Sequence, residues 1–124
     1  MTYRFLGIDH VQLAAPRNSE KLAREFYGEI LQMTEIPKPT KLLARGGVWF
    51  QCGNHQVHIG IQDEFHPATK AHPAFEVQHL HLFAEHLSAN GVEVKEDDAL
   101  EGAERFYVKD PFGNRIEFLE WKPS

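Results

Sequence analysis

The spacing of apolar positions switches along the chain between two and about four, which predicts strands alternating with helices. In the first half, a helix is expected from about residue 19 to 31, with Leu22, Phe26 and Ile30 as its apolar stripe. The strands expected in this half are residues 7–15, 33–36, 48–52 and 56–62. Residues 37–47 carry three cationic side chains between two prolines and a Gly-Gly pair, which is typical of a mobile loop.

The same pattern begins again after a polar connector, residues 63–71, in which Pro67 interrupts regular structure. A second helix is expected to end at Asn90-Gly91, and its stripe is Leu80, Phe83, Ala84 and Leu87. The strands expected in this half are residues 72–77, 92–95, 105–109 and 115–121. Both halves therefore read strand, helix and three strands, so we expect a tandem repeat of a βαβββ unit.

Four polar side chains occupy matching places in the two halves, each on the strand face opposite the apolar stripe. They are His10 and His72 in the first strands and His58 and Glu117 in the last, separated by 48 residues in one half and 45 in the other. A carboxylate inside a small domain is costly unless it is paired or binds a metal. Imidazole nitrogens with one carboxylate suit Zn, Ni, Fe, Mn or Co. The set predicts one divalent metal ion, held by His10, His58, His72 and Glu117.

The composition and net charge of the chain limit the classes of molecule that we expect it to bind. The formal net charge of −5 and the lack of a dense Lys/Arg cluster argue against nucleic acid. Eight histidines in 124 residues make a metal site worth testing. The single Cys52 excludes an internal disulfide framework, and the first residues lack the apolar run of a signal peptide or membrane span. We therefore expect a cytoplasmic protein with a small-molecule substrate and no membrane association.

Further candidates for substrate contact come from the inner strands of each half. Tyr107 shares a face with Arg105, where the phenol is suited to a substrate oxygen and the guanidinium to an anion. Trp49 and Phe50 point to opposite faces of their strand, so one should line the pocket and the other should pack in the core. The sequence does not choose between them. The remaining histidines are expected at the surface: His55, His66, His79, His81 and His86.

Three motifs carry a family resemblance: Ile-Asp-His-Val-Gln-Leu at 8–13, His-Pro-Ala-Phe-Glu-Val at 72–77 and Asp-Pro-Phe-Gly-Asn-Arg-Ile-Glu-Phe at 110–118. Together they resemble the vicinal oxygen chelate superfamily, which includes glyoxalase I, fosfomycin-resistance proteins, extradiol dioxygenases and bleomycin-resistance proteins. The resemblance implies an α+β fold whose two βαβββ modules form a cupped, half-open mixed β-barrel with helices outside. The modules would be residues 5–62 and 72–122 of one glyoxalase-like domain spanning 1–124, and a homodimer is also implied.

The resemblance also suggests roles for individual residues. His10, His72 and Glu117 fall on the usual metal-ligand positions of the family. His58 falls where glyoxalase I-like enzymes carry a Glu that is both ligand and base, so it is a candidate for a fourth ligand, a base or an outer residue. The strand face of Arg105 and Tyr107 looks into the cavity of fosfomycin-resistance proteins, which supports both as substrate contacts and Tyr107 as a catalytic candidate.

The function implied is that of a divalent-metal-dependent, glyoxalase-like enzyme with lyase, isomerase or epimerase chemistry on a small metabolite. Such a substrate chelates the metal through two neighbouring oxygens, and the metal stabilises the charge that develops when a base moves a proton. The enzyme alternatives are an extradiol-type Fe(II) dioxygenase and a thiol transferase. From another class, a metal-free protein could sequester a drug as bleomycin-resistance proteins do, but such a protein has no need of an intact ligand set.

Overall fold

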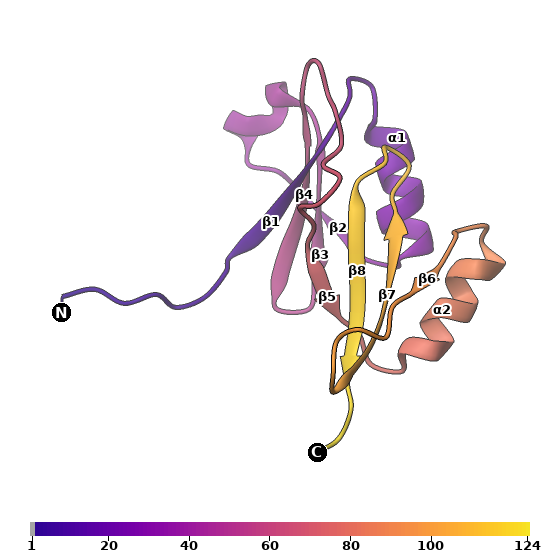
Figure 1. Ribbon diagram of the computed structural model, residues 1–124. Helices are drawn as coiled ribbons and strands as arrows, with labels where there is room; N and C mark the ends of the chain where they lie inside the picture. The colour runs from indigo at the N-terminus through magenta and orange to yellow at the C-terminus, as the bar shows by residue number, and fades with distance from the viewer. Residues whose placement is uncertain (1) are drawn as a thin grey trace. The chain divides into compact units, whose positions relative to one another are not determined.

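The computed structural model describes residues 2–124, which divide into two compact units, one ending at Asp63 and the other running from Glu64 to Ser124. Each unit contains one four-stranded mixed sheet, and the order of elements is the same in both apart from a short 3₁₀ helix between the second and third strands of the first unit (Figure 1). The predicted α+β fold with two βαβββ modules is confirmed. None of the helices in this described part of the chain is long and apolar enough to cross a membrane.

The sheet of the first unit has the strand order β1-β4-β3-β2, in which β1 runs parallel to β4 and the other neighbours are antiparallel. Phe50 of β3 is fully buried, with its ring 5.8 Å from that of Tyr27 on the helix, so the helix covers this face of the sheet. The elements of this unit are β1 (His10–Ala15), α1 (Glu20–Ala23), η1 (Arg24–Ile30), β2 (Thr34–Ile36), η2 (Thr40–Arg45), β3 (Val48–Cys52) and β4 (His55–Ile61).

The first helix changes from α to π geometry at Arg24, and this change alters which side chains it buries. The N–H of Leu31 donates to the carbonyl of Phe26, five residues earlier, as in a π-helix. Of the predicted stripe, Phe26 is buried and Ile30 is half-buried, whereas Leu22 is 48% exposed. The side chains that pack inward are Ala23, Phe26, Tyr27 and Leu31.

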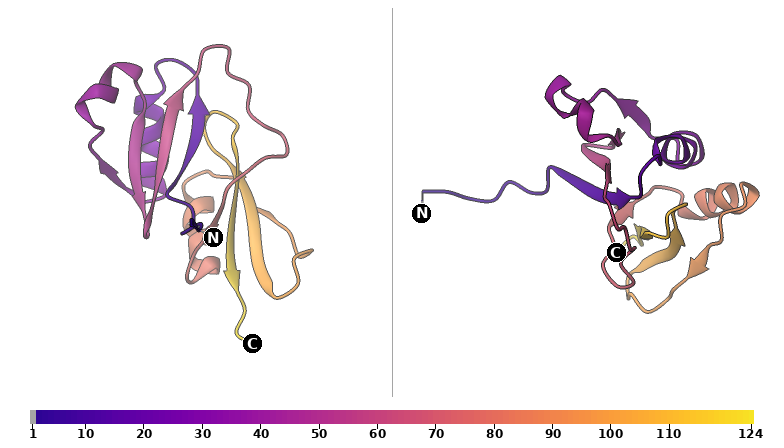
Figure 2. Two further views of the ribbon diagram at one scale, coloured as in Figure 1. Left: turned by 90° about the vertical axis from the view of Figure 1, so that its left-hand side faces the viewer. Right: turned by 90° about the horizontal axis from the view of Figure 1, so that it is seen from above.

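Strand β1 begins at His10, three residues later than the alternation predicts. His10 pairs with Gln56, which is the second residue of β4. Residues before Asp9 therefore run past the first residue of β4, His55, and find no neighbouring strand in the described part of their unit. Residues 2–9 form no regular element, are exposed throughout and extend away from the sheet of the first unit (Figure 2).

The segment predicted as a mobile loop, residues 37–47, contains the 3₁₀ helix η2 and is tied to its surroundings. The ammonium group of Lys38 donates to the carbonyl of Gly46, and the N–H of Gly47 donates to Glu20 Oε2 at 2.8 Å. That backbone hydrogen bond also lowers the pKa of Glu20. Lys38, one of the charged side chains of this segment, therefore has a structural role.

The sheet of the second unit repeats the topology of the first, with the order β5-β8-β7-β6 and β5 parallel to β8. On helix α2 the predicted stripe is confirmed: Leu80 and Leu87 are buried, and the ring centroid of Phe83 lies 4.9 Å from that of Phe118. Helix α2 therefore covers the face of β8 that carries Phe118. The elements are β5 (Ala74–Glu76), α2 (Leu80–Ala89), β6 (Lys95–Glu96), β7 (Ala103–Lys109) and β8 (Arg115–Trp121).

The turn between β7 and β8 is closed by its own polar groups. Asp110 Oδ1 accepts the N–H groups of Phe112 and Asn114 at 2.9 and 2.8 Å, and Oδ2 accepts the Asn114 amide at 2.9 Å. Gly113 supplies the positive φ of 93° that the turn needs. The Asp-Pro-Phe-Gly-Asn motif is thus explained by structure alone, since it fixes the register that places Glu117 opposite Tyr107.

Helix α2 is capped by a carboxylate from outside the helix. Glu120 of β8 accepts the N–H groups of His79 and Leu80, each at 3.0 Å. These two backbone hydrogen bonds hold the pKa of Glu120 below its ordinary value of 4.5. A carboxylate at this place satisfies N–H groups that have no partner within the helix and interacts favourably with the helix dipole.

Replacing Glu120 with Gln should lower the melting temperature at neutral pH, because the amide carries no charge and has only one acceptor oxygen. Since the pKa of Glu120 is lower in the folded state than in the unfolded state, its stabilisation is fully present above the unfolded value and is lost as the pH falls through the folded value. The difference in melting temperature between the wild type and Glu120→Gln, measured by circular dichroism, should therefore shrink below about pH 4. Glu85→Gln, with the same charge change on the exposed side of α2, is the control; an equal, pH-independent effect of both would contradict the cap.

Candidate functional site

In the second unit, polar side chains gather on the sheet face opposite α2. Glu117 of β8 projects from this face because its neighbour Phe118 faces the helix. Its side chain is buried, and its Oε1 lies 2.9 Å from Nε2 of His72, which directly precedes Pro73 and the start of β5. Tyr107 of β7 pairs directly opposite Glu117 in the sheet register. The structure therefore brings His72, Glu117 and Tyr107 together.

The surroundings of His72 fit a metal ligand. Its Nδ1 lies 2.9 Å from the carbonyl oxygen of Lys70, which can only accept, so Nδ1 carries a proton and donates. In a neutral ring Nε2 then carries a lone pair that faces the Glu117 carboxylate, and this contact is satisfied either by a proton on Nε2 or by a cation held between the two atoms. The 2.9 Å separation of the two atoms is that of a direct hydrogen bond or ion pair, and it is close enough for both side chains to reach one ion.

Tyr107 and Arg105 share this face with Glu117. Burial raises the pKa of Tyr107, and the nearby Glu117 carboxylate raises it further, so the phenol is a proton donor at neutral pH. Arg105 Nη1 donates to Glu117 Oε2 at 3.4 Å and its Nη2 donates to Asp97 at 3.3 Å. Among the described residues, Arg105 Nε is buried and has no hydrogen-bond partner, which leaves one donor for an oxygen of a bound molecule.

Arg115 lies on the same face and was not among the residues predicted from the sequence. Its guanidinium carbon lies 4.1 Å from the ring centroid of Tyr107, and its Nη1 donates to the carbonyl of Lys70 at 3.3 Å. The stacked guanidinium holds the phenol ring in place and adds positive charge beside it. The signal was available, because Arg115 and Glu117 are two residues apart on β8 and therefore share a face.

In the first unit, three aromatic rings form a stack on the sheet face opposite the helix. His58 is only 4% exposed and lies between Trp49, at 3.7 Å between ring centroids and 2° between planes, and His10, at 4.2 Å and 20°. Trp49 pairs directly opposite His58 in the register of β3 and β4. The question left open by the sequence is thus answered: Trp49 lies beside His58, and Phe50 packs in the core. Phe50 is therefore withdrawn as a substrate contact.

Each histidine of this stack keeps one ring nitrogen available. His10 Nδ1 lies 2.9 Å from the Asp9 carboxylate and donates to it, which leaves Nε2 as an acceptor. His58 Nε2 lies 2.9 Å from Gln56 Oε1, which leaves Nδ1. Burial lowers the pKa of His58 and the neighbouring His10 lowers it further, so His58 is neutral at physiological pH. A neutral imidazole is the form that binds a metal or accepts a proton.

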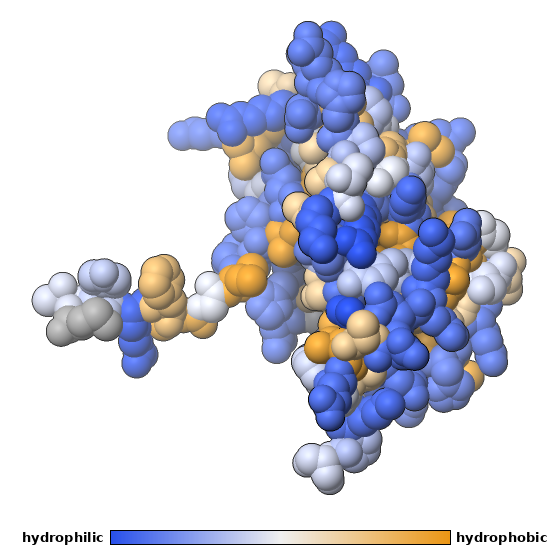
Figure 3. All heavy atoms as spheres, viewed as in Figure 1, coloured by the Kyte–Doolittle hydropathy of each residue, from blue (hydrophilic) through white to orange (hydrophobic). Residues whose placement is uncertain are grey.

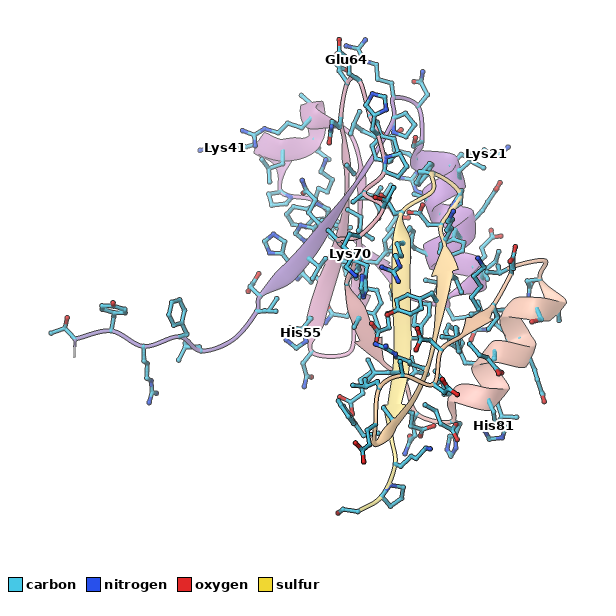
Figure 4. All side chains as sticks on the ribbon, in the orientation of Figure 1. Lys21, Lys41, His55, Glu64, Lys70 and His81 are labelled. Carbon is cyan, nitrogen blue, oxygen red and sulfur yellow. The ribbon has the colours of Figure 1, made fainter. Side chains whose placement is uncertain are left out.

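Each unit thus gathers two of the four predicted ligands. Within residues 2–124, no group of three or more His, Cys, Asp or Glu side chains is placed to hold a metal ion. Among the remaining histidines, His55 at the β3–β4 turn and His81 on α2 are exposed as expected (Figure 4). His86 differs, because it is half-buried with its ring 6.4 Å from that of Phe83.

The chain belongs to the Glyoxalase/Bleomycin resistance protein/Dioxygenase superfamily, whose sequence profile matches residues 7–118. The vicinal oxygen chelate resemblance is confirmed. A crystal structure of a protein from Bacillus anthracis, described as a glyoxalase family protein, is 54% identical and superposes with a TM-score of 0.96 over 98% of this chain and 100% of that one. No protein with a curated functional description matches this chain.

More distant structures share the fold. Lactoylglutathione lyase from Agrobacterium tumefaciens is 19% identical, with a TM-score of 0.75 over 95% of this chain and 96% of that one. A genomically encoded fosfomycin resistance protein from Listeria monocytogenes is 22% identical, with a TM-score of 0.73 over 94% of both chains. At these identities the likeness establishes the fold, and the reaction has to be argued from the side chains.

Proposed function

We propose that this protein is a divalent-metal-dependent, glyoxalase-like enzyme that moves a proton on a small metabolite with two neighbouring oxygens. The observation that carries the proposal is the His72 and Glu117 pair. The imidazole already donates through Nδ1, and its other nitrogen faces a buried carboxylate at 2.9 Å. A pair of this kind, in which the carboxylate is buried, is stabilised by a cation shared between its two facing atoms.

The proposed ligands are His72 and Glu117 of the second unit with His10 and His58 of the first, the two pairs belonging to one chain or to two copies of it. Three imidazoles and one carboxylate suit Zn, Ni, Co, Fe or Mn. When bound, a divalent ion supplies Lewis acidity toward two substrate oxygens. The names of two similar structures, a lactoylglutathione lyase and a fosfomycin resistance protein, are compatible with this class of chemistry.

The remaining side chains have roles that follow from their contacts. Tyr107 keeps its proton at neutral pH and is suited to donate a hydrogen bond to a substrate oxygen. The free Nε of Arg105 is a second donor on the same face. In the first unit, His58 is neutral, and its one available nitrogen, Nδ1, serves either as the fourth ligand or as the base that accepts a proton from a carbon next to a carbonyl, while the flat indole ring of Trp49 lies beside it. Return of that proton to a different atom gives isomerisation and its return to the opposite face gives epimerisation, whereas lyase chemistry also requires that a bond to a leaving group next to the deprotonated carbon breaks.

The metal content of the purified chain tests the proposal. After reconstitution and dialysis, elemental analysis should find about one Zn, Ni, Co, Fe or Mn per chain. Proton transfer is measured as deuterium uptake from solvent, by NMR, at the carbon next to the carbonyl in a panel of α-hydroxycarbonyl compounds and their thiol adducts. A chain that holds no metal and exchanges no proton would overturn the proposal.

His58→Ala separates the two roles proposed for that residue. If His58 is the base, the variant should keep its metal and lose proton exchange by about 100-fold or more. If His58 is mainly a ligand, metal content and exchange should fall together. His55→Ala is the matched control, because His55 is an exposed histidine at the start of the same strand. An exchange rate unchanged in His58→Ala would contradict both roles.

A further inference from the structure

The backbone carbonyl of Lys70 accepts hydrogen bonds from two side chains of the second unit. His72 Nδ1 donates to it at 2.9 Å, and Arg115 Nη1 donates to it at 3.3 Å. A carbonyl oxygen has two lone pairs, so it accepts both donors at the same time. Figure 4 labels Lys70 beside β8, and Figure 3 shows hydrophilic atoms on the surface at this place. One oxygen therefore links a proposed metal ligand to a cationic side chain of β8.

Arg115 has a second contact, with the ring of Tyr107. Its guanidinium carbon lies 4.1 Å from the ring centroid, closer than the guanidinium carbon of Arg105, which lies at 5.5 Å. A guanidinium is planar and carries its N–H groups along its edge, so it can stack on a ring and donate to a carbonyl together. Arg115 therefore touches the ring of one site residue and the hydrogen-bond acceptor of another.

The segment that carries Lys70 is held against the β7–β8 hairpin on both sides of that residue. Before it, Pro67 packs on the turn, since a Cβ built on Gly113 would lie only 3.1 Å from the Pro67 ring. After it, the carbonyl of Pro73 accepts the N–H of Glu117 at 3.0 Å. Between these two anchors, the hydrogen bond from β8 holds the Lys70 carbonyl itself.

We propose that Arg115 is a positioning residue that holds His72 and Tyr107 in the geometry that the reaction requires. This inference rests on the proposed function, which gives the two residues their roles as metal ligand and hydrogen-bond donor. Through the Lys70 carbonyl, Arg115 fixes the orientation of the His72 ring, so that Nε2 stays directed at Glu117. Loss of a partner that orients a ligand weakens metal binding by about 10- to 100-fold. Arg115 acts one contact farther out, so we expect the lower end of that range.

A side chain that contributed only its positive charge would behave differently. Lys109 pairs directly opposite Arg115 on β7, lies on the same face of the sheet and is exposed. If charge alone mattered, removal of the Lys109 charge would change the site in the same way. Because the proposed role depends on a hydrogen bond and a stacked ring, only changes at Arg115 should affect the His72 ring. Lys109→Met is therefore the matched control for Arg115→Met.

Exchange of the His72 Nδ1 proton with solvent tests the positioning without a metal. In chelator-treated, isotope-labelled protein, NMR should show that this proton exchanges at least about 10-fold more slowly than the ring protons of the exposed His55. In Arg115→Met it should exchange at least about 5-fold faster than in the wild type, whereas Lys109→Met should match the wild type. A wild-type His72 proton as fast as those of His55, or a rate unchanged in Arg115→Met, would overturn the proposal.

Metal affinity, measured by isothermal titration with Zn, tests whether this positioning matters for the site. Arg115→Met should bind Zn about 10-fold more weakly than the wild type does. Arg115→Lys keeps the charge and a donor for the carbonyl, so it should bind only about 3-fold more weakly. Lys109→Met should bind as the wild type does. Equal losses of affinity in Arg115→Met and Lys109→Met would overturn the proposal.

The two measurements separate this inference from the proposed function. If the wild type binds no metal but its His72 proton is protected and Arg115→Met loses that protection, the proposed function fails and the positioning of the ring stands. If the wild type binds metal and Arg115→Met changes neither measurement, the proposed function stands and the role of Arg115 fails. Exchange in the wild type needs no variant, so it tests the inference even if Arg115→Met does not fold.

Discussion

Glu117→Gln is expected to weaken metal binding by at least about 100-fold, because removal of an outer partner of a ligand already costs about 10- to 100-fold. Glu117 is the only carboxylate among the four proposed ligands, and its Oε1 faces His72 Nε2 at 2.9 Å. An amide of the same shape keeps acceptor capacity for Arg105 and Tyr107 but brings no charge to a cation. Isothermal titration with Zn or Ni, starting from chelator-treated protein, measures the change.

The control for this variant is Glu104→Gln, which changes the same charge at an exposed position on the neighbouring strand β7. Melting temperatures in chelator should be compared for both variants, so that loss of the fold is distinguished from loss of the ligand. Metal affinity in Glu117→Gln equal to that of the wild type would show that the carboxylate serves only the ion pairs with His72 and Arg105. The proposed function would then lose the observation on which it rests.

Gly47→Ala should be the most destabilising of the small substitutions considered, costing more than about 3 kcal/mol of unfolding free energy. Gly47 has a φ of 90°, and a Cβ built there would lie 2.1 Å from the carbonyl oxygen of Ile59. That oxygen belongs to the backbone of β4, which is paired with β3 directly after Gly47, so it has little room to move. Relief of the contact would pull apart the strands that carry Trp49 and His58.

Gly53→Ala is the matched comparison, because Gly53 also has a positive φ, 56°, but nothing lies within 4 Å of a Cβ placed there. It should cost only the backbone strain of a left-handed residue, about 1–2 kcal/mol. Urea unfolding of both variants separates the steric contact from the backbone strain. Equal losses of stability in the two variants would mean that the approach of Ile59 is relieved by small shifts.

Much of the fold could be predicted from the sequence, because the segments whose apolar positions are most regularly spaced are also the elements that pack most regularly. The stripe of α2 and the alternation of β8 gave the right faces, since Phe83 and Phe118 meet while Glu117 points away. The first helix was expected at the right place, but its π geometry was not, because side-chain spacing does not reveal a change from α to π hydrogen bonding. The start of β1 depends on where β4 ends, which is a property of another strand.

The strand faces that carry the candidate site residues could be predicted in part for the same reason. Alternation places His58 and Glu117 opposite the apolar stripes, and both project from the faces that the helices do not cover. Alternation also separates Trp49 from Phe50, but it does not say which of the two faces the helix covers. That choice is set by the packing of Phe50 against Tyr27, a contact between residues far apart in the sequence.

The closed turn at Asp110–Asn114 has a consequence for how the polar cluster of the second unit assembles. Glu117 meets Arg105 across a hairpin with a separation of 12 residues, but it meets His72 only across 45 residues. Closing the longer loop costs about 1 kcal/mol more in chain entropy than closing the shorter one. The turn therefore brings Glu117 and Arg105 together through a short loop. The contact of Glu117 with His72 depends instead on the parallel pairing of β5 with β8. Local opening of β5 would separate the proposed ligands while the hairpin stays intact.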